Sequence, residues 1–223
     1  MIPKAMLFDL DDTLTDRHST LKFYADMFLL EFGRRMQQPS RQTVLDVLFH
    51  YDRGGYDPRR AANIVEAVDW LAPPTVEQVT HHWKREFPKC VRARVGLFEM
   101  LDALQIRGIA LGIITNGPIP GQDVKIDCLR IRPYFDVVLV SDAIGIKKPD
   151  PEIFNMALSR MGYAAEETWF VGDHPENDVL GADTVGMTPV WARYEQTWPL
   201  PQVEPGYAID SLTGLLRLVE KSN

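Results

Sequence analysis

The chain has 223 residues, of which 45% are hydrophobic and 25% charged, as is ordinary for a globular protein with one sizeable core and a smaller module. The formal net charge of −7 argues against a nucleic-acid polymer or an anionic membrane as the main partner. Cys90 and Cys128 match no disulfide or metal-binding pattern, so we expect both to be free thiols. No apolar stretch approaches the ~20 residues of a membrane span, and no signal peptide is evident. We therefore expect a cytoplasmic protein.

The first predicted element is a short buried strand at 5–8, and it is followed at once by acidic residues. Asp9 and Asp11 belong to a D-x-D-x-T segment at the end of this strand. In open parallel sheets, ligands bind at the carboxyl ends of the strands. Two carboxylates two residues apart can supply a nucleophile and a proton carrier, and together they favour a divalent cation. The alternative is an acidic turn that only caps a helix.

The next part of the chain contains no strand-like run and is predicted to be helical. Pro39-Ser40 separates the first pair of helices, and Thr75 with Gln78 forms a capping box that starts the last helix. We therefore expect an all-helical module inserted between the first strand and the rest of the chain. Its predicted helices are 19–38, 41–50, 58–72 and 76–86.

From about Gly96 onwards, short strands alternate with helices, which predicts β-α-β units and a central parallel sheet. A surface loop packed by Trp198 is expected at 194–207. The predicted strands are 109–114, 137–140, 168–171 and 189–191. The predicted helices are 97–107, 122–131, 151–161, 176–184 and a last one after Ser211.

Polar side chains follow these predicted strands at their carboxyl ends. Thr115 and Asn116 follow the second strand of the sequence, while Lys148 precedes a helix start. Asp173 follows a later strand, and Asp178 comes five residues after it. Because right-handed crossovers place the carboxyl ends of parallel strands on one edge, we expect these side chains to meet the acidic residues of the first strand.

An acid, a threonine, a lysine and a G-D-x-x-x-x-D segment in this order resemble the four signature motifs of the haloacid dehalogenase-like hydrolase superfamily. The resemblance runs from about Ala5 to Trp191. It implies an α/β fold: a Rossmann-like three-layer catalytic core with a central parallel sheet, formed by 1–15 and 89–223. It also implies that the inserted module, 16–88, is an all-α cap domain.

The resemblance further implies a Mg²⁺-dependent phosphatase that hydrolyses a small phosphomonoester, a nucleotide or a sugar phosphate, through an aspartyl-phosphate. Asp9 is then the nucleophile, and Asp11 is the general acid and base. Asp9, Asp173 and the backbone carbonyl of Asp11 would bind the metal. Thr115 and Lys148 would hold the transferred phosphoryl group.

Further residues receive supporting roles. Asn116 is expected to hold phosphoryl oxygens together with Thr115, and Thr13 to fix the loop after the nucleophile. Asp178 is expected either to support the metal site or to bind the metal directly. In the helical module, a glycine-rich break at 51–56 carries Arg53. It is either a plain turn between helices or a loop that binds the leaving group of the substrate.

Other activities on the same fold stay open. A 2-haloacid dehalogenase resembles this chain but lacks the acid at the position of Asp11 and needs no metal. A phosphomutase would carry a cap His-Lys segment that we do not find, and phosphonate hydrolysis would need a cap lysine such as Lys22 or Lys84. A non-catalytic binding module is expected to have lost a motif. The T-N-G segment and the size of the cap look most like pyrimidine nucleotidase and N-acylneuraminate-9-phosphatase relatives. The pattern carries no signal for an oligomeric state.

Overall fold

The computed structural model describes residues 2–52, 57–194, 196–200 and 205–221. Within them, six strands form one parallel sheet in the order β3-β2-β1-β4-β5-β6. Strand order reverses at β1, which is where open α/β sheets bind their ligands. The strands are β1 (Ala5–Phe8), β2 (Ala110–Thr115), β3 (Val137–Val140), β4 (Thr168–Gly172), β5 (Thr188–Ala192) and β6 (Tyr207–Ile209).

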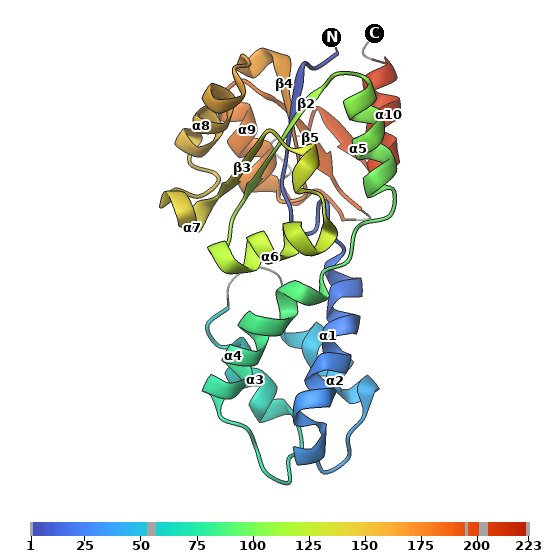
Figure 1. Cartoon of the computed structure of the whole chain (residues 1–223), viewed down its shortest axis with the longest axis vertical. Helices are drawn as coiled ribbons and strands as arrows, with labels where there is room; N and C mark the ends of the chain where they lie inside the picture. The colour runs from blue at the N-terminus through green and yellow to red at the C-terminus, as the bar shows by residue number, and fades with distance from the viewer. Residues whose placement is uncertain (1, 53–56, 195, 201–204, 222–223) are drawn as a thin grey trace.

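Helices cover both faces of the sheet, which confirms the predicted three-layer α/β core (Figure 1). One face packs against α5 (Leu97–Ile106) and α10 (Leu212–Lys221), and the other against α8 (Pro151–Met161) and α9 (Gly181–Thr184). The short helix α7 (Ser141–Ile144) follows β3. In Figure 1, α6 (Ile119–Leu129) lies between the sheet and the helices below it.

The residues of β1 show why this segment becomes the centre of the sheet. All four are fully buried. Met6 and Phe8 belong to the apolar core on the α5 and α10 side, whereas Leu7 belongs to the core on the α8 and α9 side. Side chains alternate between the faces of a strand, so a continuous apolar run is what a sheet covered on both faces requires.

The four helices after β1 form a separate helical unit, with the 3-10 turn Phe87–Cys90 at its end (Figure 1). They share an apolar core of their own, centred on aromatic side chains such as Tyr24 and Phe28. The predicted capping box of Thr75 and Gln78 is present. The helices are α1 (Arg17–Phe32), α2 (Arg41–Tyr51), α3 (Arg60–Ala67) and α4 (Val76–Glu86).

Two adjacent segments connect the helical unit to the sheet. Thr15 forms an isolated antiparallel bridge with Ala93. The N–H of Asp16 donates to the carbonyl of Arg92 at 2.8 Å, and the N–H of Arg94 donates to the carbonyl of Leu14 at 3.0 Å. The chain therefore leaves the core and returns to it through a short paired region.

Several predicted boundaries were wrong. The first helix ends at Phe32 and continues as a short 3-10 turn, instead of reaching 38. The helix predicted at 58–72 is shorter, because Trp70 pairs with Met36 in a β-bridge and its Nε1–H donates to the carbonyl of Val65 at 2.8 Å. The helix predicted at 122–131 begins earlier, at Ile119, and ends at Leu129.

Two elements were missed, and one has a different geometry. The sequence pattern did not predict α7 or β6, both of which are short. The helix predicted at 176–184 begins as a π-helix at Pro175–Leu180 before it becomes α9. In the segment before β6, Trp198 packs its ring on Trp191 with centroids 4.9 Å apart. None of the described helices is both long and apolar enough to cross a bilayer.

Candidate active site

The structure brings the predicted strand-end residues to one edge of the sheet. Asp9, Thr115 and Asp173 directly follow or end β1, β2 and β4, and β1 pairs with both other strands. The N–H of Asp9 donates to the carbonyl of Val171 at 2.9 Å, which continues the sheet up to the acidic residue. Parallel pairing therefore places these three residues at one edge of the sheet, with Asp9 on the strand between the other two.

Lys148 reaches this edge from the segment before α8 and forms two buried ion pairs. Its Nζ lies 2.6 Å from Oδ1 of Asp9 and 2.7 Å from Oδ1 of Asp178. Burial raises the pKa of Asp9 to about 7, although the ammonium of Lys148 opposes this. Burial alone would lower the pKa of Lys148, but the Asp178 and Asp9 carboxylates raise it above its usual range.

Asp178 has both carboxylate oxygens engaged. Oδ1 faces Lys148, and Oδ2 accepts a hydrogen bond from the N–H of His174 at 2.9 Å. The side chain packs so closely on β4 that a Cβ at Gly172 would lie 2.4 Å from it, so a side chain is excluded there. This arrangement suits a residue that supports the site by holding Lys148.

The site has the donors that a divalent cation needs. Asp9, Asp173 and Asp178 each offer a carboxylate oxygen, and these atoms lie within 4.8 Å of one another. The hydroxyl of Thr13 donates to Oδ1 of Asp173 at 3.1 Å. Burial and the neighbouring Asp9 and Asp178 carboxylates raise the pKa of Asp173 well above its usual value. Three clustered carboxylates and one lysine leave an excess of negative charge, which fits a hard cation such as Mg²⁺.

Asn116 holds the main chain of Lys148. Its Nδ2 donates to the carbonyl of Lys148 at 2.9 Å, and its Oδ1 accepts from the N–H of Lys148 at 3.0 Å. The side-chain amide that was expected to hold phosphoryl oxygens is thus engaged with the protein. Contact with a substrate by Asn116 stays a prediction.

The Asp11 carboxylate accepts from two residues that the sequence pattern did not single out. Lys125 Nζ lies 2.6 Å from both carboxylate oxygens of Asp11, and Gln122 Nε2 donates to Oδ2 at 3.0 Å. Burial raises the pKa of Asp11, but Lys125 and then Arg17 lower it more, so the pKa lies below its usual value. The available signal was a glutamine and a lysine three apart, on one face of the helix after Thr115.

The predicted substrate loop of the helical unit is described only in part. Arg53 and the rest of 53–56 lie outside the described residues. Asp52 is buried at the end of α2, where it accepts two hydrogen bonds of 2.7 Å from Arg17 and lies 2.9 Å from Arg60 Nη2. Asp52 therefore ties together the starts of α1 and α3 and the end of α2.

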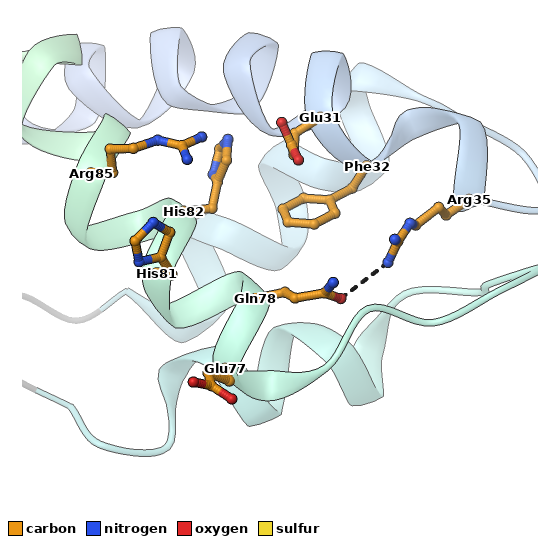
Figure 2. Close-up of a pocket in the computed structure, with 8 residues that line it drawn as sticks. All are labelled: Glu31, Phe32, Arg35, Glu77, Gln78, His81, His82 and Arg85. Carbon is orange, nitrogen blue, oxygen red and sulfur yellow. Dashed lines mark hydrogen bonds between the residues drawn. The ribbon is translucent and has the colours of Figure 1, made fainter.

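A cavity of about 310 Å³ lies elsewhere in the helical unit (Figure 2). It is lined by the last turn of α1 and by α4, and Arg35 closes one side by donating to Oε1 of Gln78 at 3.2 Å. Glu31, which lines the cavity, comes 15 residues after Asp16, the residue that caps the start of α1. At ~1.5 Å of rise per residue, the cavity therefore lies roughly 20 Å along α1 from the end of this helix that adjoins the core. This cavity is lined by none of the predicted site residues that the structure describes.

Known proteins are similar to this chain over most of its length. A family model described as haloacid dehalogenase-like hydrolase matches residues 6–192. The glyceraldehyde 3-phosphate phosphatase of Methanocaldococcus jannaschii is 30% identical, with 97% of each chain aligned. That of Pyrococcus furiosus is 32% identical over 99% of this chain and 94% of its own length. A phosphoserine phosphatase of Thermus thermophilus is 32% identical over 72% of this chain and 58% of its own length.

Solved structures share the fold. A putative HAD-hydrolase, YfnB, from Bacillus subtilis bound to magnesium is similar over 98% of this chain and 99% of its own, with a TM-score of 0.78 and 22% identity. At this level of identity, the similarity concerns the fold alone.

Proposed function

The chain belongs to the haloacid dehalogenase-like hydrolase family, and we propose that it is a magnesium-dependent phosphatase acting on a small phosphomonoester. One observation carries the proposal: the carboxylates of Asp9 and Asp173 cluster with the ammonium of Lys148 at the strand ends where strand order reverses, and Thr115 ends the neighbouring strand β2. These groups match what phosphoryl transfer needs, namely a nucleophile, donors for the phosphoryl oxygens and compensation of negative charge.

In the proposed reaction, a carboxylate oxygen of Asp9 attacks phosphorus while the bond from phosphorus to the leaving oxygen breaks. Asp11 gives a proton to that leaving oxygen, and its carboxylate, which accepts from Lys125 and Gln122 in the free protein and has a lowered pKa, must take up this proton beforehand. Water then attacks the phosphorus of the aspartyl-phosphate, and Asp11 takes a proton from the water. Orthophosphate leaves, and Asp9 is regenerated. Thr115 and Lys148 donate hydrogen bonds to the phosphoryl oxygens in both steps.

Asp9, Asp173 and the backbone carbonyl of Asp11 are the groups that would hold Mg²⁺. When bound, the ion would offset the repulsion between these carboxylates and a phosphate dianion. Asp178 is better suited to anchoring Lys148, since both of its oxygens already have partners.

We further propose that the helical unit, within 16–88, is a cap over a catalytic core formed by 1–15 and 89–223. Its separate apolar core and the paired connection at Thr15 and Ala93 support this division. The core residues handle only the phosphoryl group, so discrimination between leaving groups must come from elsewhere, and the cap is the source we propose.

The substrate class that we favour is a sugar phosphate or a nucleotide. The glyceraldehyde 3-phosphate phosphatases align over nearly the whole of this chain, which supports a small phosphorylated metabolite.

A substrate panel tests the proposal. Purified protein is incubated with Mg²⁺ and glyceraldehyde 3-phosphate, phosphoserine, nucleoside monophosphates or 4-nitrophenyl phosphate, and orthophosphate is measured. Halide release from a 2-haloacid is measured in parallel. We expect orthophosphate release that stops in chelator and no halide release. Halide release without any phosphoester hydrolysis would instead identify a dehalogenase.

A further inference from the structure

Helix α6 sends a nearly buried lysine into the site. The side chain of Lys125 is only 8% exposed. Besides its contacts with both oxygens of Asp11, its Nζ lies 2.8 Å from Oε1 of Gln122, and it lies 6.0 Å from the ring centroid of Phe87 in the helical unit. A lysine that loses its water shell in this way must be compensated, and the Asp11 carboxylate is the charge that compensates it.

Gln122 connects this pair to the second strand end. Its Nε2 donates both to Oδ2 of Asp11 and to the hydroxyl of Thr115. One helix therefore links the residue that we propose as the acid and base to the hydroxyl that we propose for the phosphoryl group. Because helix backbones are rigid, side chains at positions three apart hold both partners in a fixed relation.

Arg17 is the other cation that influences Asp11, but it is already committed. Arg17 forms a bidentate ion pair with the buried Asp52, whereas Lys125 contacts Asp11 directly. The direct hold on Asp11 in the described residues thus comes from α6.

We propose that Lys125 and Gln122 are positioning residues that hold the Asp11 carboxylate where it exchanges a proton with the leaving oxygen of the substrate. This inference rests on the proposed phosphatase function. Lys125 itself does not contact the reacting atoms in this scheme. It acts through Asp11, so its loss must show the pattern of a misplaced acid.

Two substrates separate positioning from general damage. The value of kcat/KM reports the steps up to departure of the leaving group. A poor alkoxide leaving group needs the proton from Asp11, whereas 4-nitrophenolate leaves without help. For Lys125→Met, we expect kcat/KM to fall ~10–100-fold for the best alkyl phosphate of the panel, as part of the ~10²–10⁴-fold of general acid catalysis. For 4-nitrophenyl phosphate, we expect a change of less than about threefold in the same variant.

Matched variants complete the kinetic test. Lys125→Arg keeps the cation and should recover most of the activity. Gln122→Leu should lower kcat/KM for the alkyl phosphate more than for 4-nitrophenyl phosphate, as Lys125→Met does. Lys147→Met is the control, since Lys147 is exposed and next to Lys148 in sequence but is in neither set of contacts. Equal losses for both substrates in Lys125→Met would overturn the proposal, because they would show damage to the phosphoryl site.

A double-mutant cycle tests the contact independently of activity. Lys125→Met should lower kcat/KM for the alkyl phosphate less in the Asp11→Asn background than in the wild-type background. It should also shift the urea midpoint of unfolding less in that background. Additive effects on unfolding would overturn the inference, whatever the enzyme's activity. If the wild type has no phosphatase activity but the effects of the two substitutions on the urea midpoint are non-additive, the proposed function is refuted while the contact between Lys125 and Asp11 is confirmed.

Discussion

At the scale of single residues, Lys148 determines the electrostatics of the site. Its side chain is 2% exposed, and it lies between two carboxylates. The K-P-D-P pattern predicted this lysine and its place near Asp9. It did not predict that Asn116 holds its main chain or that Asp178 holds its ammonium, because these partners lie about thirty residues away in sequence and depend on tertiary packing. Lys125 was missed for the same reason.

Asp9→Asn should abolish turnover while the fold is kept. The substitution is nearly isosteric, it removes the nucleophile, and Lys148 retains Asp178 as a partner. The measurements are kcat with Mg²⁺ for the best substrate and circular dichroism for the fold. Asp150→Asn, at the exposed cap of α8, is the control and should stay active. More than a few per cent of residual activity in a clean preparation would exclude Asp9 as the nucleophile.

At the scale of elements, the sequence was informative where burial is uniform. Continuous apolar runs predicted β1 to β5, since a sheet covered on both faces needs such strands. Helix ends were predicted less well, because they depend on contacts between distant segments, such as the bridge from Met36 to Trp70. β6 was missed because its three residues pair, among the described strands, with β5 alone, and two of them are exposed.

The pairing of α1 and α4 should make the helical unit sensitive to mild acid. His82 is buried, and its Nδ1 lies 2.9 Å from the hydroxyl of Tyr24. Burial lowers the pKa of His82 below the usual ~6.5, so the unfolded chain binds the proton more tightly than the folded chain. The stability that the neutral ring contributes is therefore present above about pH 6.5 and is lost as the pH falls below it.

Urea unfolding between about pH 5 and pH 7.5 measures this effect. In His82→Gln, the loss of stability towards acid should be smaller than in the wild type. His81→Gln is the matched control, because the neighbouring ring is exposed, and it should follow the wild type. Identical pH dependence of the wild type and His82→Gln would contradict the prediction.

At the scale of the whole molecule, the change from helical spacing to alternating strands and helices predicted a helical block between β1 and the rest of the core. Pattern alone could not place this block relative to the catalytic edge. That placement depends on the paired segments at Thr15 and Ala93 and on α6, which lies between the sheet and the helical unit (Figure 1).

Mg²⁺ should stabilise the whole chain against unfolding. The clustered carboxylates of Asp9 and Asp173 repel one another, and a cation that binds only the folded state adds about 2.7 kcal/mol at a hundredfold excess over its Kd. Melting temperature should rise with Mg²⁺ and saturate, and Asp173→Asn should lose most of the rise. Asp183→Asn, on α9, should keep it. A rise of equal size in Asp173→Asn would show that the cation binds elsewhere.

The final prediction concerns how the helical unit affects chemistry at the sheet. Arg53→Ala should lower kcat/KM for the preferred substrate by roughly ten- to more than a hundredfold, as expected for loss of a charge-assisted contact of about 1.5–3 kcal/mol. The small substrate 4-nitrophenyl phosphate should be nearly unaffected, since Thr115 and Lys148 hold only its phosphoryl group. Arg59→Ala, at an exposed position before α3, is the control for a lost surface charge. Arg60→Gln should instead lower the stability to urea, because Arg60 pairs with the buried Asp52. If Arg53→Ala lowers kcat/KM equally for both substrates, Arg53 supports the fold or closure of the cap and does not bind the leaving group.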